Sequence, residues 1–296
     1  MHIPQIQYSE PLFRPPSEGR SFILQITDGC SWNSCAFCEM YTSKKFRVRK
    51  EEDIFQEIDL MSPYASQIKK VFLADGNAMV LSFDKLMRIL DKLNSTFPNL
   101  IRISAYALPK DINSKTDSQL KALADAGLKL LYTGVETGDD ELLKLIYKGE
   151  TMQSTIVGLL KARRAGIKLS VMILNGLGGK AYSKQHALNS AMVVNKVQPE
   201  YLSTLVLSFP LGIEHYKNRF LGNFFELSKI DLIEEMGVFI DKLELESTIF
   251  RSDHASNYLI LKGILNRDKK KLLQRIVDVL NNPQYSDLRP EWMRGL

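Results

Sequence analysis

Short apolar runs alternate with amphipathic stretches along residues 21–210 of the chain. The runs have the length and composition of buried parallel strands, and the stretches between them carry apolar residues at helical spacing. Such an alternation of strand and helix patterns indicates repeated βα units. The predicted strands are residues 21–27, 70–73, 101–105, 128–134, 167–174 and 201–207.

Helical patterns occupy the segments between these strands. Parallel strands joined by helices cross over with a right hand, and successive crossovers of this kind curl a sheet into a barrel. The sequence therefore predicts an α/β fold, a partial (β/α)6 TIM-like barrel with a C-terminal helical extension. The predicted helices of the barrel are residues 51–61, 83–93, 117–126, 140–146, 152–165 and 183–197.

The C-terminal part of the chain has a different pattern. Helical stretches at residues 226–243 and 268–281 flank the segment 247–258, which is too polar for a core strand. A barrel of so few strands leaves one flank open, and we expect the C-terminal part to cover it. The predicted parts are an N-terminal arm at 1–20, a core barrel at 21–210 and an extension at 211–296.

Composition bears on the location of the protein and on its partners. The N-terminal residues contain no apolar run, and no stretch approaches the ~20 apolar residues of a membrane span. We therefore expect a cytoplasmic protein without a membrane segment. Lys and Arg exceed Asp and Glu by 39 to 34. Much of the excess lies at residues 44–50 and 267–271, which we interpret as solvated surface and not as a nucleic-acid face.

All three cysteines, Cys30, Cys35 and Cys38, fall within nine residues directly after the first predicted strand. An odd number of cysteines this close together makes no disulfide framework and indicates a metal in a reducing compartment. Three thiolates without a fourth suit an iron–sulfur cluster that leaves one iron open for a small ligand. The alternative is a zinc site completed by a histidine. The histidines of the chain are His2, His186, His215 and His254.

The cysteine loop resembles that of the radical S-adenosylmethionine (radical SAM) superfamily. An aromatic residue before the last cysteine, here Phe37, is typical of that family, and so is the place of the loop after the first strand. The family's usual spacing is three and then two intervening residues. Here it is four and then two, which matches a less common variant. The resemblance covers about residues 20–210.

Turns after the later strands resemble the family's cofactor-binding segments. Residues 75–77 take the place of a Gly-Gly-Glu-like turn that receives the amino group of the cofactor. Residues 134–140 resemble a Gly-x-Gln-Ser-Gly segment of the family, and Lys148 lies where the family has a basic partner for the cofactor carboxylate. Residues 173–179 resemble the loop that passes the adenine. Ser104 ends the third strand and is expected to face the cofactor. The expected cofactor-binding residues are Phe37, Asp75, Gly76, Asn77, Ser104, Glu136, Lys148, Asn175 and Gly176.

The resemblance implies an oxygen-sensitive enzyme with one 4Fe-4S cluster on the three cysteines and S-adenosyl-L-methionine as its second cofactor. An external one-electron donor such as flavodoxin or ferredoxin would reduce the cluster. Cleavage of the cofactor then gives methionine and a 5'-deoxyadenosyl radical, which abstracts hydrogen from an unidentified substrate. No further cysteine is present for an auxiliary cluster, and we expect no cobalamin-binding domain before residue 21.

The sequence also resembles a little-characterised Elp/MiaB/NifB-like subgroup of the family. Residues 40–41 (Met-Tyr), 45–49 (Lys-Phe-Arg-Val-Arg) and 254–258 (His-Ala-Ser-Asn-Tyr) carry this resemblance, which brings no substrate with it. We expect the segment 247–258 to be a lid. Its catalytic residues, which should face the cofactor cavity, are Arg251, His254 and Asn257. A histidine titrates near neutrality, which suits general acid–base chemistry.

A small molecule is favoured over a nucleic acid as substrate. Two other hypotheses remain. The first is a radical SAM enzyme that modifies RNA or a peptide, which basic residues along the rim of the barrel mouth would favour. The second is a non-catalytic iron–sulfur or zinc-binding protein, which would cleave no cofactor.

Overall fold

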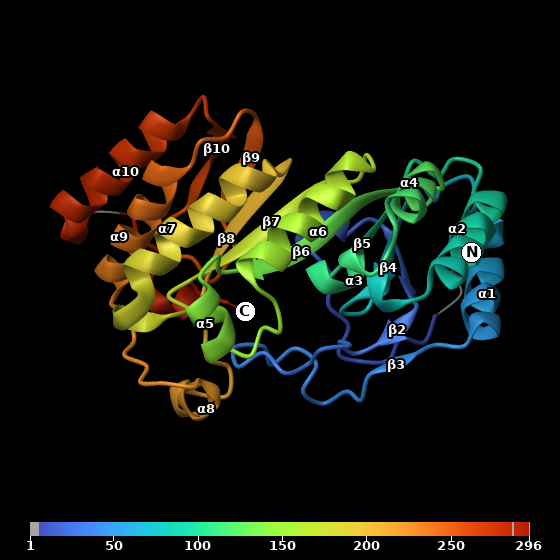
Figure 1. Ribbon diagram of the computed structural model, residues 1–296, viewed down its shortest axis with the longest axis horizontal. Helices are drawn as coiled ribbons and strands as arrows, with labels where there is room; N and C mark the ends of the chain where they lie inside the picture. The colour runs from blue at the N-terminus through green and yellow to red at the C-terminus, as the bar shows by residue number, and fades with distance from the viewer. Residues whose placement is uncertain (1–5, 286, 296) are drawn as a thin grey trace. The chain divides into compact units, whose positions relative to one another are not determined.

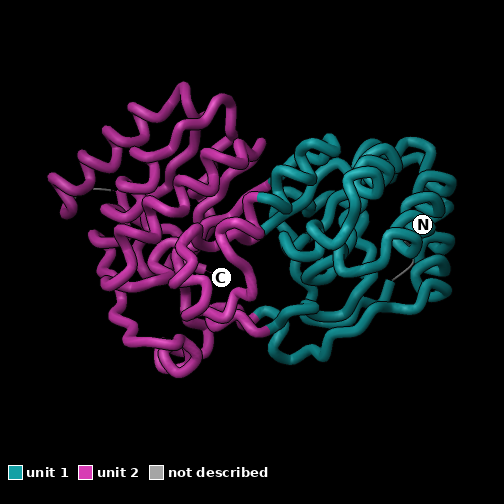
Figure 2. Tube along the Cα trace, viewed as in Figure 1, with its two compact units in different colours: residues 1–33, 40–133, 157–169 teal, residues 34–39, 134–156, 170–296 magenta. Residues whose placement is uncertain are grey.

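The computed structural model describes residues 6–285 and 287–295 and divides into two compact units (Figure 2). Unit 1 extends to Asn33 and continues through residues 40–133 and 157–169. Unit 2 comprises residues 34–39, 134–156 and the chain from Ser170 onward. Both units therefore receive part of the cysteine segment. The predicted division at residues 20 and 210 stays a prediction.

Parallel strands form the sheet of unit 1 (Figure 1). Every residue of its first strand is buried, as expected for a strand that is covered on both faces. In hydrogen-bonded order the strands are β1 (Phe22–Gln25), β4 (Lys70–Ala74), β5 (Arg102–Tyr106) and the beginning of β6 (Leu128–Glu136). A separate antiparallel pair consists of β2 (Thr27–Asp28) and β3 (Arg47–Val48), which lie before and after the cysteine segment in the chain.

Amphipathic helices accompany these strands. In α2 the buried residues Leu86, Ile89, Leu90 and Leu93 recur at helical spacing, which fixes the face that packs inward. A capping box between Thr116 and Gln119 starts α4. The helices are α1 (Glu51–Leu60), α2 (Phe83–Thr96), α3 (Pro109–Asn113) and α4 (Asp117–Asp125), with 3-10 turns η1 (Pro16–Glu18), η2 (Ser62–Tyr64) and η3 (Ala78–Val80).

The strands of unit 2 are parallel except for the last pair. β7 (Lys168–Asn175) pairs with β8 (Tyr201–Val206), and β8 pairs with β9 (Thr248–Ser252). The last strand, β10 (Leu261–Leu265), pairs with β9 in antiparallel orientation. Helix α6 (Met152–Arg164) begins in unit 2 and ends in unit 1. The other helices of unit 2 are α5 (Asp140–Leu145), α7 (Gly179–Val197), α8 (Ile213–Arg219), α9 (Lys229–Lys242) and α10 (Lys269–Asn281), with 3-10 turns η4 (Pro283–Tyr285) and η5 (Glu291–Met293). Each strand and helix predicted from the sequence is present, with ends shifted by a few residues.

The extension contains a strand that the sequence analysis did not predict. Residues 247–258 were expected to be too polar for a core strand, and this is wrong for β9. Thr248, Phe250 and Ser252 are buried in alternation, and the Thr248 hydroxyl donates to the carbonyl of Pro199 at 2.6 Å. The buried Thr248 thus has its hydrogen bond, and Arg251 points outward, whereas the hydroxyl of the buried Ser252 has no partner among the described residues.

No helix among the described residues has both the length and the apolar character needed to cross a membrane.

Replacement of Phe250 by alanine tests the role of β9 in the core. Phe250 is completely buried, and removal of a buried phenylalanine side chain costs about 3–5 kcal/mol. We expect a loss of this size in the free energy of unfolding, measured by urea denaturation. Ile260→Ala is the control, since that side chain is 51% exposed, and it should cost much less. Equal losses in the two variants would contradict a core role for β9.

Candidate active site

None of the three cysteines is in a disulfide bond, and they lie in different units. Cys30 belongs to unit 1, whereas Cys35 and Cys38 belong to unit 2. Cys35 is buried, and the other two are half-buried. Within residues 6–285 and 287–295, no group of three or more His, Cys, Asp or Glu side chains is gathered closely enough to hold a metal ion. The surroundings of the thiols are therefore described unit by unit.

Cys30 lies against a glycine of the turn that follows β4. A Cβ atom added at Gly76 would lie 2.9 Å from Cβ of Cys30 and 3.0 Å from the ring of Tyr41, so no other residue fits without displacing the loop. The amide of Gly76 also donates to the carbonyl of Gly29 at 3.2 Å. Glycine is therefore needed at position 76 because the backbone of the turn contacts the cysteine loop directly, and the predicted role of Gly76 in cofactor binding stays a prediction.

Asp75 is completely buried and holds the same loop through its carboxylate. Its Oδ2 accepts from Nζ of Lys44 at 2.7 Å, and from the backbone amide of Gly29 and the side-chain Nε2 of Gln25 at 3.1 Å each. Burial raises the pKa of Asp75, even though these donors and the charge of Lys44 act in the opposite direction. The sequence analysis did not single out Lys44, because it appeared there only as part of a basic run.

The side chains of Asn77 and Ser104 are also bound to the protein. Asn77 donates to Oγ of Ser31 at 2.8 Å and to Oδ2 of Asp111 at 2.6 Å, and it accepts from the amide of Leu108 at 3.2 Å. Ser104 donates to the carbonyl of Val71 on the neighbouring strand at 3.3 Å. Both residues are fully buried. These side chains connect loops and strands of unit 1, so a ligand at these turns would meet mainly backbone.

Glu136 and Lys148, both predicted from the sequence to bind the cofactor, form a pair in unit 2. Nζ of Lys148 lies 3.2 Å from Oε1 of Glu136, and both side chains are buried. Burial acts to lower the pKa of Lys148, but the negative charges of Glu136, Cys35 and Cys38 outweigh it and raise that pKa above its usual value. The ammonium group also lies 5.6 Å from the ring centroid of Phe37. Lys148 is therefore a cation held beside two of the three thiols.

The turn after β7 is held by an acid that the sequence analysis missed. Gly176 has a φ of +81°, and its amide donates to Oε1 of Glu235 on α9 at 2.6 Å. Burial raises the pKa of Glu235 to about 7, although hydrogen bonds from Ser183 and Gly176 act to lower it. Nε2 of His186 lies 3.8 Å from the same oxygen, and burial lowers the pKa of His186 to about 4. At pH 7 His186 is therefore neutral, whereas Glu235 is about half protonated.

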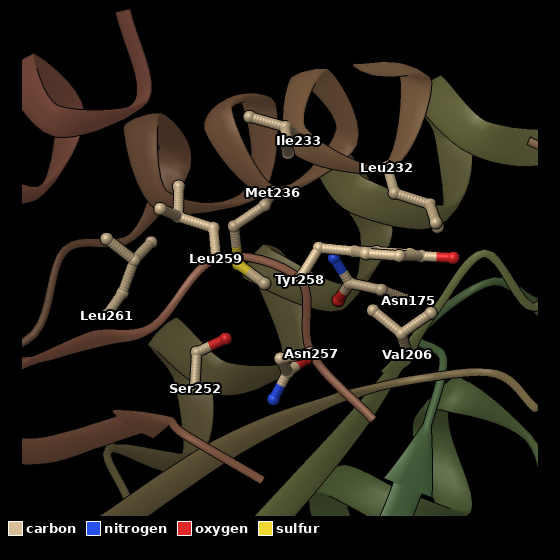
Figure 3. A pocket seen from close by; sticks show the side chains of 10 residues that line it. All are labelled: Asn175, Val206, Leu232, Ile233, Met236, Ser252, Asn257, Tyr258, Leu259 and Leu261. Atoms are coloured by element: carbon tan, nitrogen blue, oxygen red, sulfur yellow. The ribbon is translucent and has the colours of Figure 1, made fainter. Parts of the chain in front are cut away.

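A small cavity lies beside this turn, in unit 2 (Figure 3). It measures about 20 Å³, which is room for one water molecule. Three buried polar atoms of its lining have no hydrogen-bond partner among the described residues: Nδ2 of Asn175, Oγ of Ser252 and Oδ1 of Asn257. Apolar side chains of α9 and the ring of Tyr258 form the rest of the wall (Figure 3). The lining residues are Asn175, Val206, Leu232, Ile233, Met236, Ser252, Asn257, Tyr258, Leu259 and Leu261.

The segment after β9 crosses the carboxyl end of β8. Nδ2 of Asn257 donates to the carbonyl of Thr204 at 2.8 Å, and Oγ of Ser256 accepts from the amide of Val206 at 3.1 Å. Nδ1 of His254 lies 3.0 Å from the same Ser256 hydroxyl, and burial lowers the pKa of His254. Arg251 is exposed, because alternation along β9 places it on the face opposite Ser252. Of the three predicted catalytic residues, only Asn257 lines this water-sized cavity, together with Asn175, and the catalytic roles of all three stay predictions.

A family model described as the radical SAM superfamily matches residues 24–186, which is more than half of the chain. The heme chaperone HemW of Bacillus subtilis is 25% identical over 141 residues, which are 47% of this chain and 37% of that protein. A putative methylthiotransferase of Methanocaldococcus jannaschii is 22% identical over 161 residues, which are 51% of this chain and 34% of that protein. The chain thus spans about a third of the length of these curated relatives.

Two solved structures are similar in fold. Coproporphyrinogen III oxidase (HemN) of Escherichia coli, a radical SAM enzyme, gives a TM-score of 0.59 at 18% identity over 75% of this chain and 52% of that one. The radical S-adenosylmethionine methyltransferase TsrM of Kitasatospora setae gives 0.52 at 20% identity over 66% of this chain and 36% of that one. The predicted fold class, an α/β fold of the radical SAM partial-barrel type, is thereby confirmed.

Replacement of Glu235 by glutamine should change how stability depends on pH. The pKa of Glu235 is raised from 4.5 to about 7 on folding, so its contribution to stability is complete below pH 4.5 and is lost as the pH rises through 7. A neutral amide escapes this loss, while its oxygen still accepts from Gly176. We expect the melting temperature of Glu235→Gln, relative to wild type, to increase between pH 5 and pH 8. The exposed neighbour Glu234→Gln is the control, and the same pH trend in both variants would contradict the assignment.

Proposed function

Because the chain belongs to the radical SAM superfamily, we propose that it cleaves S-adenosylmethionine reductively at a single 4Fe-4S cluster held by Cys30, Cys35 and Cys38. The observation that carries the proposal is that the family match includes the entire cysteine segment, whose three cysteines form no disulfide bond. The sequence has no other cysteine to hold a second cluster. The motifs at residues 40–41, 45–49 and 254–258 support membership of the Elp/MiaB/NifB-like subgroup.

The residues near the thiols suit such a cluster. Cysteine thiolates are the usual ligands of iron–sulfur clusters. The buried ammonium of Lys148, which interacts with the negative charges of Cys35 and Cys38, lowers the cost of holding two thiolates away from water. When bound, the cluster supplies the single electron that splits S-adenosylmethionine into methionine and a 5'-deoxyadenosyl radical, which abstracts hydrogen from the substrate.

The chain itself binds the cofactor and excludes water. We propose that Lys148, oriented by Glu136, binds the cofactor carboxylate, and that the turns at Gly76 and Gly176 present backbone to the rest of the cofactor. Asp75, Asn77 and Ser104 act indirectly, because their side chains hold these turns and strands in place. The segment across the carboxyl end of β8 keeps that end of the sheet from solvent, which a radical reaction requires.

We propose a small molecule as substrate and an external one-electron donor, such as flavodoxin or ferredoxin, as partner. Unit 1 has a cavity of about 420 Å³ at the start of β1 and β4. The basic side chains in its lining are Arg14, Arg20, Lys69 and Lys70. Active sites of barrel enzymes lie at the opposite, carboxyl ends of the strands. This charge is therefore poorly placed to guide RNA to the chemistry, and it favours the small-molecule hypothesis.

Anaerobic reconstitution tests the cluster assignment. Wild-type protein should take up about four irons and, with a chemical reductant, convert S-adenosylmethionine to 5'-deoxyadenosine. Alanine at any one of the three cysteines should abolish the cluster absorbance and this product, measured by liquid chromatography. Stoichiometric zinc without iron, or iron without cofactor cleavage, would instead support the non-catalytic hypothesis.

Replacement of Asn257 by alanine tests the role of the segment across β8. The change removes the hydrogen bond to Thr204, so the segment should close less tightly while iron content and cofactor affinity stay the same. We expect faster formation of 5'-deoxyadenosine in the absence of substrate. Arg251→Ala, whose side chain is exposed on the other face of β9, should behave as wild type. An unchanged rate in Asn257→Ala would show that the segment only packs against the sheet.

A further inference from the structure

The segment that carries Cys35 and Cys38 is bound by an arginine from the C-terminal extension. Nη2 of Arg219, the last residue of α8, donates to the carbonyl of Cys35 at 2.8 Å. Nη1 of the same residue donates to the carbonyl of Cys38 at 3.4 Å. The two acceptors are the backbones of two predicted cluster ligands, and one planar guanidinium group contacts both. A lysine at this position would have no such fork.

Further contacts hold both ends of α8 in this position. Before the helix, the amide of Leu211 donates to Oε2 of Glu39 at 3.0 Å, and after it the amide of Leu221 donates to the carbonyl of Leu145 at 3.0 Å. Phe37 packs against a buried cluster that includes Tyr216 and Phe220 of the same segment. Arg219 is therefore held in place by its neighbours, which limits the entropy lost when its side chain is ordered.

The charge of Arg219 is not neutralised by a carboxylate among residues 6–285 and 287–295, where its hydrogen bonds go to the two carbonyls. Lys148, whose charge interacts with Cys35 and Cys38, is paired with Glu136. Arg219 places a further positive charge close to the backbone of the same two cysteines. A positive charge favours the reduced, more negative state of an iron–sulfur cluster, whose potential follows the local charge.

We propose that Arg219 is a positioning residue for the iron–sulfur cluster. It fixes the backbone of residues 35–38 so that two thiols are presented together, and its charge raises the reduction potential of the cluster bound there. The second half of this proposal rests on the proposed function, since it needs the cluster. The first half does not, because the fixed backbone is a property of the protein without iron.

Alkylation of the iron-free protein tests the first half. Full-length wild type, Arg219→Gln, Arg219→Lys and the control Lys217→Gln are treated with iodoacetamide, and the rate at each cysteine is followed by mass spectrometry. We expect Cys35 and Cys38 to react roughly tenfold faster in both Arg219 variants. Cys30 lies in unit 1 and should react at the wild-type rate in every protein. Equal rates in Arg219→Gln and Lys217→Gln would overturn the proposal, and so would an equal acceleration at Cys30, which indicates general unfolding.

The reduction potential tests the second half. The midpoint potential of the cluster is measured in reconstituted protein by electron paramagnetic resonance during a redox titration. Arg219→Gln should have a lower midpoint potential than wild type. Arg219→Lys keeps the charge, so its midpoint potential should shift much less. Equal shifts in the two variants would overturn the charge effect. Absence of a cluster in wild type would overturn the proposed function and leave the alkylation result standing.

Discussion

The ends of parallel strands and the loops beyond them carry backbone amide and carbonyl groups that the sheet itself does not pair, and a closed site provides no water to pair them. In this protein, buried side chains from distant segments satisfy these groups. Asp75 binds the amide of Gly29, Asn77 binds that of Leu108, and Glu235 binds that of Gly176. Asn257 and the half-buried Arg219 do the same for carbonyl groups. Three of these five side chains, Asp75, Asn77 and Asn257, were predicted from the sequence to touch a ligand, and in the structure they bind backbone groups of the loops and strands.

Much of the fold could be predicted, because strands and helices leave periodic patterns in the sequence. The cysteine segment could be found for a similar reason, since its spacing is local. The pairing of Glu136 with Lys148 is also accessible, because the residues are twelve positions apart on adjoining elements. Arg219 is 184 positions from Cys35, and Glu235 is 59 positions from Gly176. Contacts of this kind have no periodicity, and only the tertiary structure reveals them.

The prediction failed where polarity was taken as a sign of exposure. Thr248 and Ser252 occupy inward positions of β9, although the threonine hydroxyl needs a partner that only a particular strand register provides. Strand alternation leaves Arg251 exposed, whereas Asn257 is buried, and the catalytic roles predicted for both stay predictions. The inward or outward direction of a polar side chain depends on where its hydrogen-bond partner lies. That position cannot be read from a short segment.

The division of the cysteine segment between the units has a consequence for biosynthesis. Residues 34–39 belong to unit 2, and the rest of that unit starts at residue 134. The contacts of residues 34–39 include Arg219. A ribosome adds roughly 5–20 residues per second, so the surroundings of Cys30 can form well before those of Cys35 and Cys38. During translation the two later thiols leave the ribosome long before the residues that enclose them. Iron delivered at that stage would meet three thiols of which two lack their surroundings, so we expect insertion to follow the synthesis of unit 2.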